Sequence, residues 1–385
     1  MLPILLGTML IVGQTPTPPP APPERWPLME QLQGTYPGWL LDGNGRRLYG
    51  WADSSVTAGS AGPTHLPMGF NYRNNEPLLQ QGWVRFEKPV QTTATTPTFG
   101  FRSDTFVGTD YRFTIARGLF DSQLYANNGQ PANYGVDPIQ FYAEAYLPQV
   151  GRGLDLKVGR FFAQFGAETS DAVSTPLASR SYNFIYDPFT HTGVLATQKV
   201  DDAWSFQAGL VTGSDVFFDT GMTPTFIGSL KWAPPTSRHS VLLATVVGSG
   251  QYDHANALNQ PQILDLVYSC KFTDRLTYTL DALVGRQDHV TDFGSVYWYS
   301  TAHYLTQTFT PRLSGTARLE LFHDFQGQRT GFQGLYTSLT LGLAYKPRPW
   351  LIFRPEVRYD INDESRPFHG QHDLATAAMD MIVRW

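Results

Sequence analysis

Charged residues recur at every second position in the segment 351–360, near the C-terminus. Arg354, Glu356, Arg358 and Asp360 alternate there with Phe353, Pro355, Val357 and Tyr359. Guanidinium and carboxylate groups gathered on one face of a strand can attract and orient ions and dipolar solutes when water reaches them. This is the chemistry that the sequence offers most clearly, and it is binding and steering rather than bond-making.

The same alternation places charged residues on one face of three other segments. The predicted members of this charged face are Asp155, Lys157, Arg318, Glu320, Arg354, Glu356, Arg358, Asp380 and Arg384. An arginine facing lipid near the bilayer midplane would cost about 2–4 kcal/mol. A dry core would cost several kcal/mol per ion before pairing. We therefore predict that these side chains line a water-filled lumen, with pairing for stability alone as the alternative.

Other reactive combinations are weaker. His369, His372 and Asp373 could bind a metal, and Asp360, Asn362, Asp363 and Glu364 could hold Ca²⁺, but neither set has the required spacing or framework. Gly248-Ser-Gly250 lacks the context of a nucleophile elbow. We expect no metal, no cofactor and no enzymatic activity.

The elements that must position the charged face are β-strands, because alternation with a period of two dominates from residue 48 onward. The predicted strands are 48–57, 80–88, 98–119, 140–147, 154–165, 192–199, 204–212, 225–232, 240–247, 262–272, 276–286, 296–306, 313–325, 335–346, 351–360 and 375–385. The gaps between them alternate long and short, which is typical of outer-membrane barrels with long extracellular loops and short periplasmic turns. The predicted fold is all-β: a transmembrane antiparallel up-and-down β-barrel of about sixteen strands.

Composition agrees with this fold class. Of 385 residues, only 16 % are charged and 14 % are aromatic, and the formal charge of −5 gives no reason to expect a nucleic-acid partner. No apolar run is long enough for a transmembrane helix. The single cysteine, Cys270, excludes an intramolecular disulfide.

The two ends of the chain carry different signals. Residues 1–14 resemble a signal peptide without its basic region, 15–47 form a proline-rich N-terminal linker, and 48–385 form the barrel. At the C-terminus, Met379, Met381, Val383 and Trp385 look like an outer-membrane assembly signal for the barrel-assembly machinery.

Six segments carry a family resemblance: 117–124, 155–164, 189–193, 224–228, 329–332 and 354–360. Over roughly residues 48–385 the chain resembles the OmpL-like β-barrel porins. The resemblance implies a protein embedded in outer-membrane lipid, with a water-filled channel for passive diffusion of small hydrophilic solutes or ions and no catalytic residues.

By the same resemblance, the third long loop is expected to form the constriction. This gap, 166–191, is the longest in the chain and offers Glu168, Asp171, Arg180 and Asp187. The resemblance is also compatible with a homotrimer. The sequence leaves open the solute, the oligomeric state, a non-conducting barrel that serves as an anchor or adhesin, and a soluble β protein.

Overall fold

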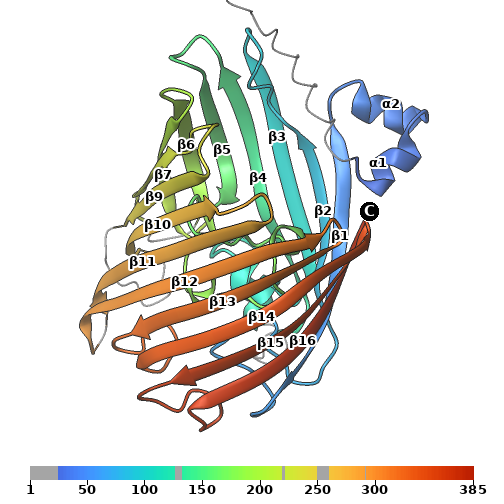
Figure 1. Ribbon diagram of the computed structural model, residues 1–385. Helices are drawn as coiled ribbons and strands as arrows, with labels where there is room; N and C mark the ends of the chain where they lie inside the picture. Colours follow the sequence, from blue (N-terminus) through green and yellow to red (C-terminus); the bar gives the residue numbers. More distant parts are fainter. Residues whose placement is uncertain (1–24, 126–131, 219–221, 249–259, 291) are drawn as a thin grey trace, which may run out of the picture.

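The computed structural model describes residues 25–125, 132–218, 222–248, 260–290 and 292–385. Two short helices, α1 (Pro27–Leu32) and α2 (Tyr36–Asp42), precede the sheet (Figure 1). The strands are β1 (Arg47–Gly59), β2 (Leu78–Lys88), β3 (Thr98–Gly108), β4 (Gly135–Leu147), β5 (Leu154–Phe162), β6 (Thr190–Lys199), β7 (Trp204–Ser214), β8 (Thr225–Trp232), β9 (His239–Val247), β10 (Gln262–Lys271), β11 (Leu276–Val290), β12 (Gly294–Thr310), β13 (Leu313–Asp324), β14 (Gly334–Arg348), β15 (Leu351–Asn362) and β16 (Asp373–Arg384).

The sheet closes on itself as a sixteen-stranded barrel, as predicted. Every strand pairs antiparallel with its neighbours in the sequence, and β1 pairs with β16 to complete the ring. Closure leaves no unpaired strand edge, which an apolar environment would not tolerate. The connections at one end of the barrel are short, such as 311–312 and 349–350, and we call this end the turn side. The opposite end, the loop side, carries the longer connections.

One predicted strand is too long. The expected strand 98–119 ends at Gly108, and the chain turns into helix α3 (Tyr111–Thr114). The ring of Tyr111 is fully buried, and its hydroxyl donates to Ala132 O at 2.6 Å. Burial of this side chain under its own loop outweighs continuation of the strand, which local propensity alone favoured.

The N-terminal predictions are only partly within the described residues. The signal-peptide-like segment 1–14 and the proline-rich stretch 15–23 lie outside them. Residues 25–46 carry the two helices, which lie beside the start of β1 and the C-terminus (Figure 1). Among the described residues, no helix is long and apolar enough to cross a bilayer.

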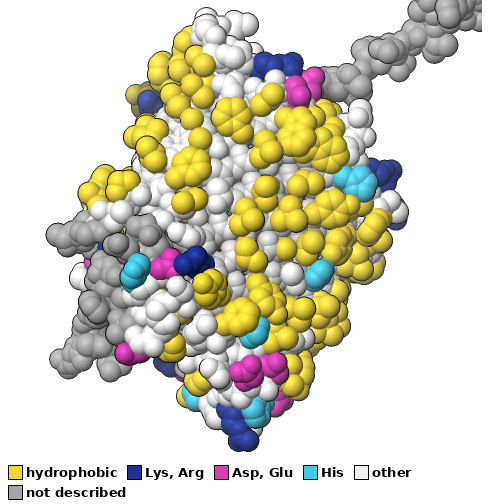
Figure 2. All heavy atoms as spheres, turned by 90° about the vertical axis from the view of Figure 1, so that its left-hand side faces the viewer, with side chains coloured by type: hydrophobic (Ala, Val, Ile, Leu, Met, Phe, Trp, Pro, Cys, Tyr) yellow, Lys and Arg dark blue, Asp and Glu magenta, His cyan; other side chains and the backbone are white. Residues whose placement is uncertain are grey.

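Apolar side chains dominate the outer face of the barrel. Leu210, Leu264, Val284 and Val357 each lie between two inward-facing neighbours and are exposed. Figure 2 shows hydrophobic side chains gathered over much of one side of the barrel. Rings also cluster on this face, as in the pairs Trp204–Trp232 and Tyr299–Phe325. An outer face of this kind is suited to hydrocarbon flanked by interfacial aromatics.

The inner face of the barrel differs from the outer face because its side chains at mid-height are buried. Each of the sixteen strands contributes an interior side chain that is at most 5 % exposed. Examples in strand order are Asp53, Gln81, Asp104, Gln140, Phe161, Leu195, Val211, Ile227, Val246, Asp265, Asp281, Ser300, Glu320, Ser338, Arg358 and Asp380. Something other than water must therefore cover the wall at this height.

Candidate functional site

The segment between β5 and β6, residues 163–189, lies inside the barrel and covers much of this wall. Its first part is held by two carboxylates: Gly166 N donates to Asp265 Oδ2 at 2.8 Å, and Ala167 N donates to Asp281 Oδ2 at 2.7 Å. Because these aspartates stand on β10 and β11 while other contacts reach β2, β13 and β15, the segment spans the lumen. We call residues 163–189 the inner loop.

Three wall arginines donate to backbone carbonyls of the inner loop. Arg354 Nη1 donates to Ala172 O at 2.9 Å and to Thr175 O at 2.7 Å. Arg318 Nη1 donates to Ser179 O at 3.0 Å, and Arg358 Nη1 donates to Arg180 O at 2.7 Å. Five guanidinium N–H groups in a fixed plane allow each arginine to serve both the loop and a carboxylate.

Two wall glutamates complete the attachment by accepting from backbone amides. Glu356 Oε2 accepts from Ala178 N at 2.9 Å and from Ser179 N at 3.2 Å. Glu320 Oε2 accepts from Tyr182 N at 2.7 Å. We call the five wall residues Arg318, Glu320, Arg354, Glu356 and Arg358 the clasp.

The arginines of the clasp are also paired along the wall. Arg354 Nε lies 3.0 Å from both oxygens of Asp380, and Arg358 Nη2 lies 2.8 Å from Asp360 Oδ1. Arg318 Nε donates to Glu320 Oε1 at 2.7 Å. Buried ions are tolerated only when their charges and hydrogen-bonding groups are satisfied in this way.

This arrangement corrects one expectation. The clasp residues and Asp380 do lie on the interior face, but they are almost fully buried rather than bathed by water. The physical reason is that the backbone of the inner loop supplies the donors and acceptors that water was expected to supply. The alternative reading, in which these charges pair for stability, describes them better in this conformation. Their role as pore-lining residues stays a prediction.

The four predicted residues of the constriction loop lie in four different surroundings. Glu168 meets the clasp, accepting from Arg318 Nη1 at 3.0 Å and from Tyr304 Oη at 2.8 Å. Asp171 lies 3.8 Å from Arg85 Nη2 on β2. The Arg180 guanidinium carbon lies 5.6 Å from the centre of the Phe70 ring, and Arg180 Nη2 donates to Ser170 O at 3.3 Å.

Asp187 lies away from the clasp. Burial is the main cause that raises the pKa of Asp187 well above its ordinary value; the negative charge of Asp265 adds to the rise, and Arg329 opposes it. Burial in turn lowers the pKa of Arg329 to about 10. Arg329 stacks 3.7 Å from the Trp298 ring centre. The attraction between the charges of Asp187 and Arg329 therefore offsets only part of the cost of burying these two groups.

Several residues that hold the inner loop were missed by the sequence reasoning. These are Asp265, Asp281, Tyr304 and Gln81; Gln81 Nε2 donates to Ser170 O at 2.8 Å. Asp265 and Asp281 were detectable, because each is a carboxylate at an inward position of an alternating strand. Gln81 and Tyr304 gave no such signal, since neutral polar residues are ordinary in strands.

Near the turn side the interior is open and basic. Lys157 lies 3.4 Å from Glu144 and Arg102 lies 2.6 Å from Glu87, so these cations are paired. Lys199, Lys231 and Lys271 are exposed, share the inward register with Thr197, Ser229 and Ser269, and have no ion-pair partner among the described residues. We call these three side chains the turn-side lysines. Asp155, also predicted, is half-buried on the same face as Lys157.

The remaining predicted residues lie at the C-terminal strand. Met379 and Met381 point outward and are 43 % and 40 % exposed. Val383 and Trp385 are half-buried, and the Trp385 ring lies where a Cβ at Gly50 would be. Arg384 faces the interior at the turn side, with its guanidinium 3.9 Å from the Trp26 ring centre. The role of this strand as an assembly signal stays a prediction.

The candidate metal ligands are engaged with other residues. His369 Nε2 lies 3.0 Å from Thr64 Oγ1, and His372 Nε2 lies 3.2 Å from Arg366 Nε. Asp360 pairs with Arg358, and Asn362 Oδ1 accepts from Glu364 N at 3.0 Å. In the part of the chain that the structure describes, no group of three His, Cys, Asp or Glu residues is placed to hold a metal.

A family model described as "Putative beta-barrel porin-2, OmpL-like" matches residues 47–385. The match begins at the first residue of β1 and ends at the last residue of the chain, so it covers the whole barrel. No curated protein matches the sequence.

Solved structures show the same fold at very low sequence identity. The anion-selective porin from Comamonas acidovorans has a TM-score of 0.58 and 9 % identity, over 88 % of this chain and 99 % of that chain. The outer-membrane channel DcaP of Acinetobacter baumannii has a TM-score of 0.57 and 11 % identity, over 88 % and 97 %. A loop-deletion mutant of OmpT from Vibrio cholerae has a TM-score of 0.55 and 10 % identity, over 88 % and 99 %.

Proposed function

The chain belongs to the OmpL-like porin family and is an outer-membrane channel for passive diffusion; from this premise we propose that the inner loop gates the channel. The observation that carries the proposal is the buried ring of interior side chains contributed by all sixteen strands. A solute cannot pass along a wall that the inner loop covers. Diffusion then requires the loop to move away from at least one arc of the wall.

The clasp makes the closed arrangement stable and also defines how it opens. Breaking one buried charge pair typically costs about 3–5 kcal/mol, because the remaining charge is left uncompensated. Exposure to water during opening would restore part of this energy, since a hydrated guanidinium needs no protein partner. The wall charges would then line the open passage, which is the role that the sequence predicted for them.

The double variant Arg318→Gln with Arg358→Gln tests the gate. Both side chains donate to the inner loop, at Ser179 O and Arg180 O, and glutamine cannot maintain these contacts together with the carboxylate pairs. We expect a higher single-channel conductance or open probability in planar bilayers than for the native protein. Heat-modifiable migration on a detergent gel verifies that the variant is a folded barrel.

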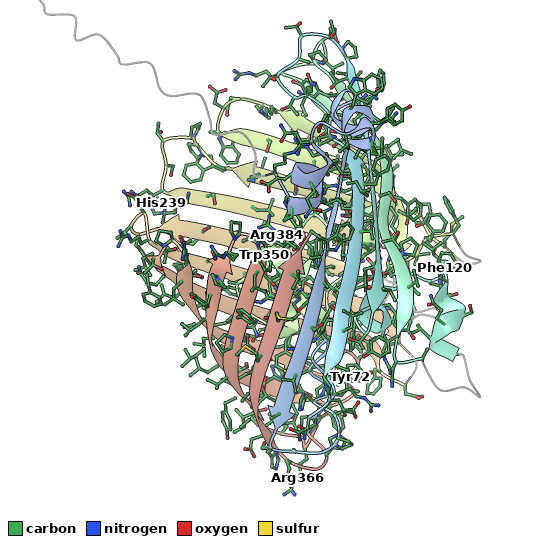
Figure 3. The ribbon with its side chains drawn as sticks, turned by 90° about the vertical axis from the view of Figure 1, so that its right-hand side faces the viewer. Tyr72, Phe120, His239, Trp350, Arg366 and Arg384 are labelled. Carbon is green, nitrogen blue, oxygen red and sulfur yellow. The ribbon has the colours of Figure 1, made fainter. Side chains whose placement is uncertain are left out.

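Arg366→Gln is the control for loss of an exposed charge, because Arg366 is exposed on the loop side, at the far end of the barrel from Arg384 (Figure 3). It removes one positive charge without touching the inner loop, so its conductance should equal that of the native protein. A folded double variant with native conductance and open probability would contradict the gate.

We propose further that the barrel catalyses no reaction, since its interior charges hold the inner loop. We also propose that the C-terminal strand is read by the barrel-assembly machinery.

We also propose that the protein forms a homotrimer. A groove of about 500 Å³ on the outer face, lined by small residues such as Ala58, Ala375 and Ala377, supports close packing of a neighbouring barrel. A monomeric mass in mild detergent would count against the trimer.

A further inference from the structure

The second N-terminal helix, α2, presents an apolar surface at the turn side of the barrel. Tyr36 is 72 % exposed, Trp39 is 65 % exposed and Leu40 is 39 % exposed. The rings of Tyr36 and Trp39 stack with their centres 6.0 Å apart, so they form one continuous patch. We call these three side chains the apolar face of α2. Large apolar side chains that gather on a surface mark a site of interaction.

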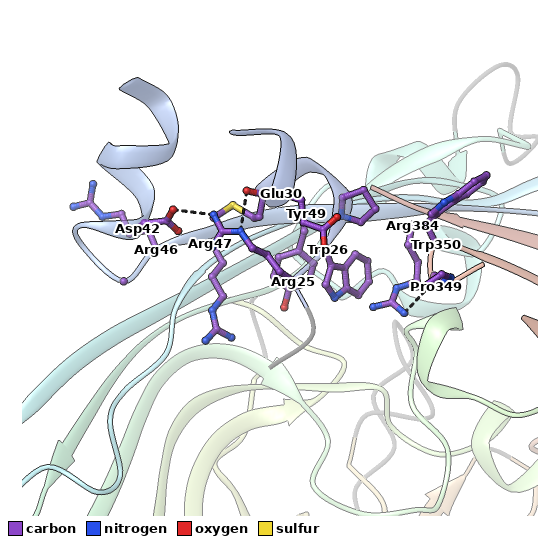
Figure 4. A pocket seen from close by; sticks show the side chains of 13 residues that line it. Arg25, Trp26, Glu30, Asp42, Arg46, Arg47, Tyr49, Pro349, Trp350 and Arg384 are labelled. Atoms are coloured by element: carbon purple, nitrogen blue, oxygen red, sulfur yellow. Dashed lines mark hydrogen bonds and ion pairs between the residues drawn. The ribbon is translucent and has the colours of Figure 1, made fainter. Parts of the chain in front are cut away.

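The helix that carries this face is held at both of its ends. Thr35 caps α2 by accepting from Gly38 N at 3.2 Å, and Gly38 is buried against α1, where even a Cβ would collide with Leu32 O. At the other end, Asp42 accepts from Arg25 Nη2 at 2.8 Å (Figure 4). The apolar face is therefore presented in a fixed position.

The first helix, α1, joins this unit to the rim of the barrel. The ladder between β1 and β16 begins at Trp51. Ahead of that point, Leu48 N donates to the buried Met29 Sδ at 3.4 Å. Together with β1, the turn 349–350 and Arg384, α1 encloses a cavity of about 980 Å³ (Figure 4). Both helices are thus attached to the turn-side rim, and α2 lies outside the ring of strands (Figure 1).

The neighbouring outer face of the barrel is aromatic near the same rim. Phe99 on β3 is 65 % exposed, and the outward-facing rings of Phe86 and Phe101 lie with their centres 5.0 Å apart. A groove of about 610 Å³ lies between residues 42–45, at the end of α2, and residues 88–91, where β2 ends. The apolar face of α2 therefore belongs to a segment that borders the lipid-facing surface.

The residue types of α2 suit the boundary between lipid and water. Tyrosine and tryptophan are enriched at membrane interfaces, because their amphipathic rings are stable at headgroup depth. The segment 35–41 contains no charged residue, so its contact with headgroups removes no ion from water. A short helix with an apolar face lies along the interface and does not cross the bilayer.

From these observations we infer that α2 inserts its apolar face into the headgroup region of the periplasmic leaflet. The lipid surface is the occupant, because the barrel meets this leaflet beside the same groove. The contact holds the turn-side rim and both helices against the membrane. The inference does not depend on the gate, because the contacts that hold the inner loop involve other residues.

The test uses the full chain in vesicles of phosphatidylethanolamine and phosphatidylglycerol. Cys270 is the single cysteine of the chain, so Cys270→Ala allows a fluorescent dye to be attached to one introduced cysteine. Leu40→Cys reports on the apolar face, and Gln33→Cys, exposed ahead of α2, is the reference. Lipids with a nitroxide in the headgroup region should quench the dye at position 40 at least about twofold more than the dye at position 33.

A pair of substitutions then tests the rings themselves. Tyr36→Ser with Trp39→Ser should lower the quenching at position 40 to the level at position 33. The matched control, Phe120→Ser with Phe332→Ser, removes two exposed rings at the loop side and should leave the quenching unchanged. Heat-modifiable migration on a detergent gel verifies that each variant is folded, and Trp39→Ser alone replaces the first pair if that pair does not fold.

Three outcomes would overturn the inference. The first is equal quenching by the lipids at positions 40 and 33. The second is a dye at position 40 that only a water-soluble quencher reaches, which would place the face in the periplasm. The third is a dye at position 40 that neither quencher reaches while two copies of the chain crosslink through that position, which would assign the face to a second copy.

Discussion

At the scale of single residues, Asp110 is a buried carboxylate that connects the loop after β3 to the wall. It precedes α3 and accepts from Gln81 Nε2 at 2.8 Å, beneath the inner loop. Burial raises the pKa of Asp110 to about 7, although the charge of Arg180 and the hydrogen bond from Gln81 oppose the rise. Asp53 on β1 is a further carboxylate within electrostatic reach.

A raised pKa in the folded state means that folding favours the protonated form. The stability that this supplies is complete below the ordinary value of 3.8 and is lost as the pH rises through about 7. We expect the midpoint of thermal unfolding in detergent to fall as the pH rises from about 5 to about 8.

Asp110→Asn should make the midpoint of thermal unfolding depend less on pH. The corresponding change in the free energy of unfolding should be on the order of a few kcal/mol at most. Burial raises the pKa of Asp215 to about 6, so this group titrates in the same pH range. The informative quantity is therefore the difference between the native and the variant curves. Parallel curves would contradict the assignment to Asp110.

At the scale of elements, the fit between β14 and the inner loop depends on Gly342. A Cβ at this position would lie 2.5 Å from Leu177 Cδ2, a flexible side-chain end on the loop. The absence of a side chain therefore lets the loop approach the wall where Thr340 and Ser338 are also small. The clasp residues on β13 and β15 extend across this gap from either side.

Steric substitutions at Gly342 offer a test of the gate without any change of charge. Gly342→Ala should be tolerated with a small shift of Leu177, and conductance should stay near native. Gly342→Leu should push the inner loop from the wall, raising conductance as release of the clasp does. Overpacking of this kind costs about 1–3 kcal/mol. A folded Leu variant with native conductance would argue against the loop as the gate.

At the scale of the whole molecule, the two ends of the barrel differ in charge. The turn-side lysines, Lys199, Lys231 and Lys271, face an open interior without carboxylate partners among the described residues. Lumen charges without partners set a local potential that favours ions of the opposite sign. We therefore expect the open channel to prefer anions.

Replacing the three turn-side lysines by glutamine should move the reversal potential in a salt gradient toward cation preference. The measurement uses the Arg318→Gln, Arg358→Gln background as well as the native chain, so that a closed gate does not hide the effect. Arg366→Gln, which removes a positive charge at the loop side, is the comparison and should leave the reversal potential unchanged. An unchanged reversal potential in the open background would refute the assignment.

The sequence by itself determined the barrel. Alternation with a period of two and the rhythm of long and short gaps give the strand number, the antiparallel order and the two faces, because each of these depends only on neighbours along the chain. Arg354, Glu356 and Arg358 could be placed on the interior face for this reason. The predicted strand 98–119 was wrong beyond Gly108, because burial of the Tyr111 side chain under a loop outweighed the local propensity for a strand.

Only the tertiary structure decided what those interior charges touch. The clasp joins Arg354 to Thr175 and Glu320 to Tyr182, residues separated by more than a hundred positions. No spacing rule connects such residues, because the path of a long loop is set by the sum of many weak contacts with a wall that exists only after closure. The cavity around Arg384 is likewise a product of closure, which brings the first helices and the last strand together.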